Sequence, residues 1–172
     1  MNELDQVWTQ MIEQALAKAR SGGRGDVAEY FALKATNDTI RAESIKWLLD
    51  SMLEIASFAN QNGASVKIEN EDSHRFAFKN ANLVGSLVRF HQGVRCLSVE
   101  AGWTRTPNDG FMRGGALAGA QISHFGLSRH NTDLLLVQSN DLPNWFSVSS
   151  DGKRDLFDSR HLNQHFQVFL GE

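Results

Sequence analysis

The fold of this chain is decided by residues 83–101, LVGSLVRFHQGVRCLSVEA. Two strand-like segments, 83–91 and 94–101, are separated only by Gln92-Gly93. Because a two-residue linker that ends in glycine is typical of a tight β-hairpin, these segments are expected to pair with each other. Strands joined by such short turns form antiparallel sheets, since parallel strands need long crossover connections. The stretch therefore predicts an antiparallel meander.

The segments on both sides of this hairpin continue the strand pattern. After Gly63 the hydrophobic period changes from near 3.6 to near 2, the period of a half-buried strand. Residues 66–69 and 74–79 alternate between apolar and polar side chains in this way. Downstream, residues 133–139 form an almost continuous apolar run. Such a run favours a place in the centre of the sheet.

Two further segments complete the strand-rich region. Residues 145–149 and 153–157 flank Asp151-Gly152, which is a strong hairpin signal. Residues 116–125 fit both the helical and the strand period, because many of their side chains are small. We favour a strand that pairs with residues 133–139, since the flanking sequence is already strand-like, and a helix is the alternative.

The first third of the chain carries helical patterns. Apolar residues recur every three or four positions over residues 3–20, and the glycines that follow end this helix. Asp26 and Glu29 form a capping box for a second helix over residues 26–36. A third helix is expected over residues 39–61, although the helix can also run through Asn37-Asp38-Thr39 without a break.

The end of the chain predicts one more helix, over residues 159–170, which Asp158 and Ser159 can cap. Together these patterns predict a single α+β domain over residues 1–172. Its N-terminal helices pack on one face of a meandering antiparallel sheet of about six to eight strands, which lies within residues 64–157 and precedes the C-terminal helix.

The tryptophans divide into two pairs. Trp8 and Trp47 lie on the apolar stripes of the predicted helices, so we expect them in the core. Trp103 lies at a loop entrance and Trp145 at a strand start. We expect the second pair to be exposed and available for binding a protein partner.

Composition excludes several classes of protein. The 172 residues are 41% hydrophobic and carry a net charge of -3, without the basic excess that duplex nucleic acid requires. Cys96 is the only cysteine, so no disulfide forms within the chain, as expected in a reducing compartment. The N-terminus is acidic and does not resemble a secretory signal, and no segment has the apolar length of a membrane span. We expect a cytoplasmic protein.

The candidate functional segment is residues 102–119, a glycine-rich interruption of the periodic pattern. Guanidinium groups bind carboxylate and phosphate in a two-pronged manner, and glycines let backbone N–H groups approach an anion. The segment is therefore a candidate anion-binding loop, with an ordered loop held by an internal Asp109–arginine pair as the alternative. The predicted ligand-binding residues are Trp103, Arg105, Asp109, Arg113, Gly114 and Gly115.

Two weaker constellations involve histidine and cysteine. His161 and His165 are one helical turn apart and can share a metal, for which Asp158, His91 or Cys96 would have to supply a third ligand. His165 also lies beside Phe166 on the apolar face, which favours a hydrogen-bonded core histidine and no metal. Cys96 could act as a nucleophile with His91 or His124 as base, but its position within a strand favours a packing role.

Three functional hypotheses follow from these features. The first is a binding or adaptor module that holds an anionic or peptide ligand at residues 102–119. The second is a small enzyme for a phosphate- or carboxylate-bearing substrate, with Arg105 and Arg113 as clamps and Asp109 or His124 as base. The third is a structural subunit of an oligomer. None of them requires a cofactor, and neither a membrane nor duplex nucleic acid is an expected partner.

Overall fold

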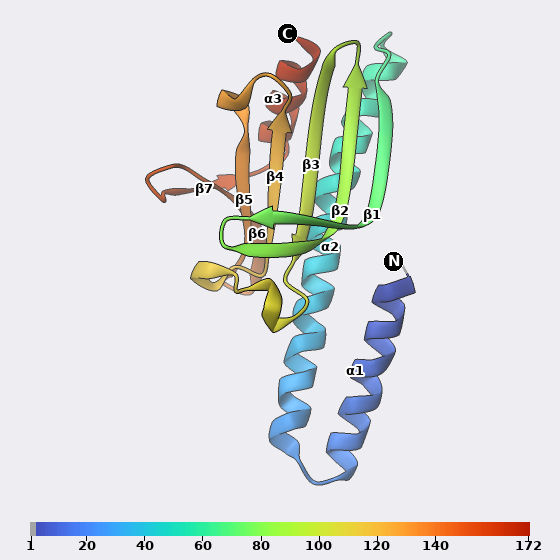
Figure 1. Ribbon diagram of the computed structural model, residues 1–172, viewed down its shortest axis with the longest axis vertical. Coiled ribbons are helices and arrows are strands. Elements are labelled where there is room, and N and C mark those ends of the chain that lie inside the picture. Colours follow the sequence, from blue (N-terminus) through green and yellow to red (C-terminus); the bar gives the residue numbers. More distant parts are fainter. Residues whose placement is uncertain (1–2) are drawn as a thin grey trace. The chain divides into compact units, whose positions relative to one another are not determined.

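The computed structural model describes residues 3–172, with side chains from residue 6 onwards, and its contacts form two compact units, 1–42 and 43–172. The helices are α1 (Glu3–Ser21), α2 (Gly25–Gln61) and α3 (Ser159–Leu170), with short 3-10 turns η1 (Pro107–Asp109), η2 (Arg113–Gly115) and η3 (Ser128–His130) (Figure 1). The strands are β1 (Lys67–Phe78), β2 (Ala81–Gln92), β3 (Arg95–Trp103), β4 (Ala118–His124), β5 (Thr132–Ser139), β6 (Leu142–Val148) and β7 (Arg154–Phe157).

The first unit is a helical hairpin made of α1 and the start of α2. Gly23 lies in the turn between them with φ of 71°, a conformation that suits glycine. The indole Nε1 of Trp8 donates a hydrogen bond to Asp38 Oδ2 over 3.2 Å, and the Lys34 ammonium lies 4.4 Å from the Trp8 ring centroid. These contacts hold the two helices side by side within the unit.

Helix α2 is one continuous helix, so the two helices predicted over residues 26–36 and 39–61 are joined. The possible N-cap at Asn37-Asp38-Thr39 is not used. The Thr39 hydroxyl instead donates to the carbonyl of Ala35 over 3.1 Å, and Asp38 pairs with Arg41 at 2.7 Å. Because these polar side chains bond within the helix and across to Trp8, they do not interrupt it.

The second unit contains the sheet, whose seven strands follow one another in chain order and are all antiparallel. The α+β prediction, the strand at residues 116–125 and the hairpins at Gln92-Gly93 and Asp151-Gly152 are thereby confirmed. The helix predicted over residues 159–170 is α3, and the Asp158 side chain caps it as expected.

The main core lies between the sheet and the helices on one of its faces, namely α2 from Glu43 onwards and α3 (Figure 1). Residues three or four apart on α2 are buried, and α3 contributes Phe166, whose ring packs edge-on against Phe90 of β2 at 5.6 Å. From the middle strands, alternate residues such as Leu134 and Leu136 point into this core. The period-2 burial is what a sheet with one covered face requires.

A second hydrophobic core lies on the opposite face of the sheet. There the end of β1 and the start of β2 cross the other strands (Figure 1), and a Cβ on Gly119 of β4 would lie 2.9 Å from Leu83 and 3.1 Å from Phe78. This core contains Phe76, Phe78, Ala81, Leu83, Ala116 and Leu135. Because parts of the sheet are covered on both faces, burial does not simply alternate along every strand. Leu134, Leu135 and Leu136 of β5 are all buried.

The crossing depends on a bulge and on two facing glycines. The register of β1 against β2 shifts between Asp72 and His74, where Ser73 has φ of 58°, so the two predicted strand segments are one bent strand. At Gly85 a Cβ would lie 1.9 Å from the Ala101 carbonyl oxygen. At its register partner Gly102 a Cβ would lie 2.6 Å from the Val84 backbone, so the backbones of β2 and β3 approach closely where β2 bends.

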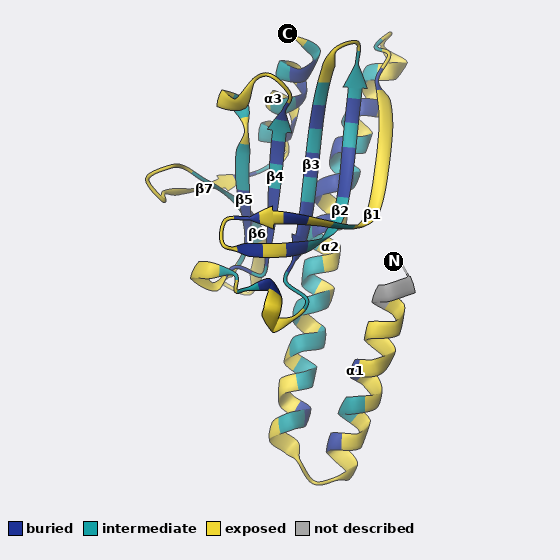
Figure 2. Cartoon of the chain, viewed as in Figure 1, coloured by how far each residue is buried: buried dark blue, intermediate teal, exposed yellow. Residues whose placement is uncertain are grey.

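The predicted exposure of several side chains is wrong. Trp103 and Trp145 are only 7% and 3% exposed, whereas Trp8 and Trp47 are 37% and 42% exposed. Burial of Trp145 leaves no polar group unpaired, because its Nε1 donates to the Ser44 carbonyl of α2 over 3.2 Å. The first half of β1 is exposed on both faces, not half-buried (Figure 2). Within the described residues, no helix is long and apolar enough to cross a membrane.

Candidate functional site

The aspartate of the predicted anion-binding loop has an internal structural role. Asp109 is 4% exposed, and its carboxylate accepts hydrogen bonds from the backbone N–H groups of Arg105 and Thr106 and from the Thr106 hydroxyl. The guanidinium of Arg75 on β1 also donates to this carboxylate, from Nη1 to Oδ1 over 2.7 Å. The Thr106 backbone hydrogen bond and these other donors lower the pKa of Asp109 to about 2, against the opposing effect of burial.

Arg105 and Trp103 are also engaged within the chain. The Arg105 guanidinium carbon lies 3.5 Å from the Trp103 ring centroid, and Nη2 donates to the Val84 carbonyl over 3.2 Å. The stacked guanidinium helps to cover the indole, which explains why this tryptophan is buried at a loop entrance. The pairing partner of Asp109 is thus Arg75, a residue outside the predicted loop.

The other half of the loop is open to solvent. Arg113, Gly114 and Gly115 are exposed, and both glycines have positive φ, 67° and 72°. The guanidinium of Arg154 on β7 reaches the loop, where Nη1 and Nη2 each lie 3.4 Å from the Gly114 carbonyl oxygen. The loop therefore divides into a buried half that stabilises the fold and an exposed half that receives a second arginine from β7.

The second candidate site is built from histidines that are distant in the sequence. His124 Nε2 on β4 lies 2.9 Å from His165 Nδ1 on α3, and the two rings stack with centroids 5.2 Å apart. The ring of His130 from η3 packs against His124 at 5.8 Å. Since one imidazole must donate and the other accept, the His124–His165 hydrogen bond needs both rings neutral or only one charged.

The environment of this pair disfavours the imidazolium form. Burial, followed by the charges of His124, His130 and His161, lowers the pKa of His165 to about 4. Burial is also the main reason why the pKa of His124 lies below its ordinary value, with His130 as a further cause. The prediction that His165 is a hydrogen-bonded histidine on the apolar face agrees with this geometry.

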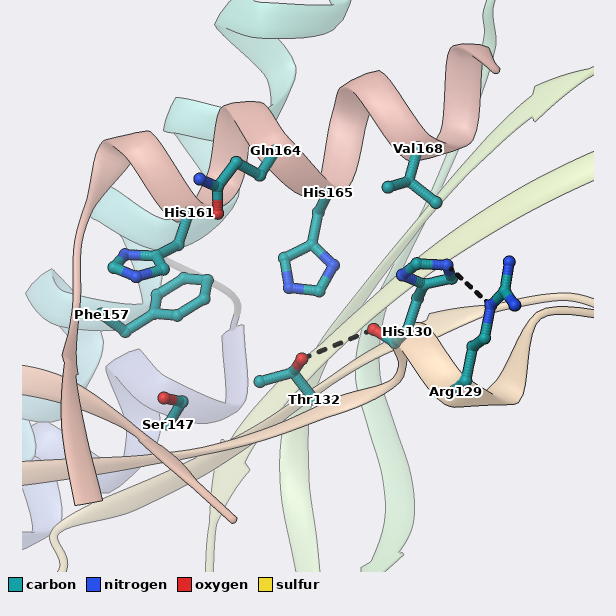
Figure 3. A pocket seen from close by; sticks show the side chains of 9 residues that line it. All are labelled: Arg129, His130, Thr132, Ser147, Phe157, His161, Gln164, His165 and Val168. Atoms are coloured by element: carbon teal, nitrogen blue, oxygen red, sulfur yellow. Dashed lines mark hydrogen bonds between the residues drawn. The ribbon is translucent and has the colours of Figure 1, made fainter. Parts of the chain in front are cut away.

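An open pocket with a volume of about 390 Å³ lies beside the pair, between α3 and the strands (Figure 3). Helix α3 lines it with His161, Gln164, His165 and Val168. The opposite wall comes from Arg129, His130, Thr132, Ser147 and Phe157. Figure 3 shows Arg129 and His130 at one end, His161 and Phe157 at the other, and the His165 ring directed between them. We call this site the histidine pocket.

His161 is held in place by the capping box of α3. Its Nδ1 lies 2.9 Å from Asp158 Oδ1, and its ring stacks on Phe157 with centroids 5.2 Å apart. The Arg160 side chain and then His161 lower the pKa of Asp158 to about 2. The Asp158 backbone N–H also donates to this Nδ1 over 3.2 Å, so both contacts of the ring with the cap are made through Nδ1, and Nε2 is left for a ligand.

The residues predicted for metal or thiol chemistry are only partly brought together. Among the described residues, no group of three or more histidine, cysteine or acidic side chains is arranged to hold a metal ion. His91 is the register partner of Cys96 across β2 and β3, but its Nε2 pairs with Glu69. Cys96 Sγ lies 3.8 Å from the Ser98 hydroxyl, and His124 pairs with His165. His124 is also far from Arg105, because its register partner Leu97 precedes Trp103 by a strand length of about 20 Å.

Sequence reasoning found only part of the histidine pocket. It singled out His161 and His165 by their helical spacing, but His130, Thr132 and Ser147 carry no local motif. Their convergence depends on the order of the strands, which brings η3, β5 and β6 beneath α3. Comparison of the chain with protein-family models, curated proteins and solved structures gave no match.

Proposed function

We propose that this protein is a binding module whose histidine pocket holds a small anionic molecule with an apolar body. The observation that supports the proposal most directly is the pocket itself, a concavity of about 390 Å³ in which one guanidinium and three imidazoles meet. Cavities of a few hundred Å³ that combine apolar walls with a few convergent polar groups are typical small-molecule sites. The lowered pKa values of His165 in the pocket and of His124 beside it also support the proposal, because perturbed pKa values are common at functional sites.

Arg129 is the group expected to bind the anionic end of the ligand. Its side chain is exposed, and among the described residues only Nε is used, to donate to His130 Nε2 over 3.2 Å. The two terminal amino groups of a guanidinium suit a carboxylate or a phosphate. Because His130 accepts that bond at Nε2, its proton lies on Nδ1, where it is a second donor.

The rest of the pocket suits a partly apolar body. Phe157 and Val168 supply apolar wall, and the His161 ring extends the surface of Phe157. Since burial keeps His165 neutral near pH 7, this part of the pocket does not favour a second negative charge. A ligand with one anionic end and one aromatic or aliphatic end fits this division.

Phenyl phosphate and benzoate are the probes for calorimetric titration. The neutral variant Arg129→Gln should weaken binding by about tenfold or more, because it removes a charge-assisted hydrogen bond. Arg20→Gln is the matched control, since it removes an exposed arginine from helix α1, and it should bind as the native protein does. Equal affinity of the native protein and Arg129→Gln for both probes would refute the proposal.

A small enzyme for the same class of ligand is the second candidate function. The contacts between Asp158 and His161 favour it, because they orient the imidazole through Nδ1 and leave Nε2 to exchange a proton with a ligand in the pocket. Hydrolysis of nitrophenyl phosphate and nitrophenyl acetate, compared between the native protein and His161→Gln, tests this candidate. Activity equal in both proteins, or none above buffer, would exclude it.

A further inference from the structure

We propose that the exposed side chains of Phe111, Arg113 and Arg154 form a second site, which binds an acidic segment of a partner protein. We call these three residues the guanidinium patch. The patch is independent of the histidine pocket, because it shares no residue with that pocket and lies on the exposed half of the loop between β3 and β4 together with β7.

Arg154 reaches the loop of Arg113 through a glycine. Arg154 places its guanidinium against the backbone of Gly114, the residue that follows Arg113. A Cβ on Gly114 would lie 2.2 Å from Arg154 Nη2, so any other residue would push the guanidinium away. With φ of 67°, Gly114 also has a backbone conformation that a side chain would disfavour.

The two guanidinium groups have no recorded acidic partner within the described residues, 3–172. Nearby acidic groups are used elsewhere, since Asp109 pairs with Arg75 at 2.7 Å and Asp155 pairs with Lys153 at 3.2 Å. Both guanidinium groups carry a positive charge on adjoining parts of the surface, and such charges attract an anion. The patch is therefore complementary to carboxylates supplied from outside the chain.

The exposed aromatic ring indicates which source of carboxylates the patch favours. Phe111 is 82% exposed and precedes Arg113 by two residues in the same loop. Arginine and aromatic residues are the types enriched at energetically important positions of protein interfaces. A free inorganic anion would use the arginines alone, whereas an acidic peptide with an apolar side chain would also cover the ring.

The test measures the fluorescence anisotropy of a labelled peptide made of glutamates and one phenylalanine, with inorganic phosphate as competitor. The double variant Arg113→Gln/Arg154→Gln should weaken peptide binding by about tenfold or more. Phe111→Ala should weaken peptide binding without changing phosphate binding, and Arg20→Gln should change neither. Raising the salt concentration from about 50 to about 300 mM should weaken the peptide complex, since both arginines are exposed.

Three results would overturn the proposal. They are equal peptide affinity in the native protein and the double variant, no effect of Phe111→Ala on peptide binding, or binding of phosphate only. Because all substituted side chains are exposed, circular dichroism should show an unchanged fold in each variant. In the same variants, the NMR signals of His130, His161 and His165 during titration with phenyl phosphate report the histidine pocket alone, and the binding constant that they give should be unchanged.

Discussion

Acidification should destabilise the protein through His165, and the size of the effect follows from its environment. The pKa of His165 is lowered from 6.5 to about 4 by burial and by the charges of His124, His130 and His161. The unfolded chain therefore takes up a proton on this residue below pH 6.5, whereas the folded chain does so only near pH 4. A difference of this size corresponds to about 3 kcal/mol of unfolding free energy, present above pH 6.5 and lost as the pH falls towards 4.

The assay is urea unfolding at a series of pH values, for the native protein and for His165→Gln. Between about pH 6 and pH 4.5 this histidine adds a slope of about 1.4 kcal/mol per pH unit in the native protein. The variant lacks the titrating ring but keeps an amide that can hydrogen-bond to His124, so its curve should be flatter by that amount. Parallel curves, or an NMR titration of His165 with a midpoint near pH 6.5, would refute the reasoning.

Three further substitutions test the fold around the sites. Gly85→Ala should lower the melting temperature sharply or prevent folding, because its Cβ would overlap the Ala101 carbonyl oxygen, whereas Gly25→Ala, which meets nothing within 4 Å, should change it little. Asp109→Asn should cost about 2–3 kcal/mol in urea unfolding, since a buried acceptor of charged and backbone donors is lost, and an unchanged midpoint would contradict its assigned role. Leu136→Ala should cost about 2–5 kcal/mol, because that side chain is fully buried, and a loss below about 1 kcal/mol would place it outside the core.

Local sequence signals were sufficient for most of the fold. The glycine turns after Gln92 and Asp151 specify tight hairpins, and the Asp158 cap specifies where α3 begins. The helix break near Asp38 could not be decided locally, because its side chain is used by Arg41 and by Trp8 across the hairpin. A cap signal has meaning only when no other partner takes the side chain.

The exposure of the tryptophans depended on tertiary contacts that periodicity does not report. The indole N–H of the buried Trp145 has an acceptor on α2, and Trp103 is covered in part by the guanidinium of Arg105. The crossing of β1 and β2 over the sheet likewise required the close pair Gly85 and Gly102, whose meaning is visible only once the strands are in register. Sequence patterns therefore predict the helices and strands, whereas they do not predict which side chains are covered once these elements pack together.

The candidate loop was found as a segment, but its internal division was not. Arg105 and Asp109 contribute to the buried half of the loop, while Arg113 is exposed and has Arg154 for a neighbour through Gly114. Nothing in the spacing distinguishes an arginine that stacks on an indole from one that faces water. Whether the loop binds an anion therefore stays a prediction, and the guanidinium patch states it in the form that the geometry supports.

The central claim, that the histidine pocket binds a small anion, is tested most directly by NMR of the imidazole groups during titration with phenyl phosphate. The chain has six histidines, so each ring can be assigned and followed separately. We predict that the signals of His130, His161 and His165 shift together with one binding constant, while His74 and His91, which do not line the pocket, keep theirs. No shift at the three pocket histidines, or equal shifts at all six histidines of the chain, would contradict the claim.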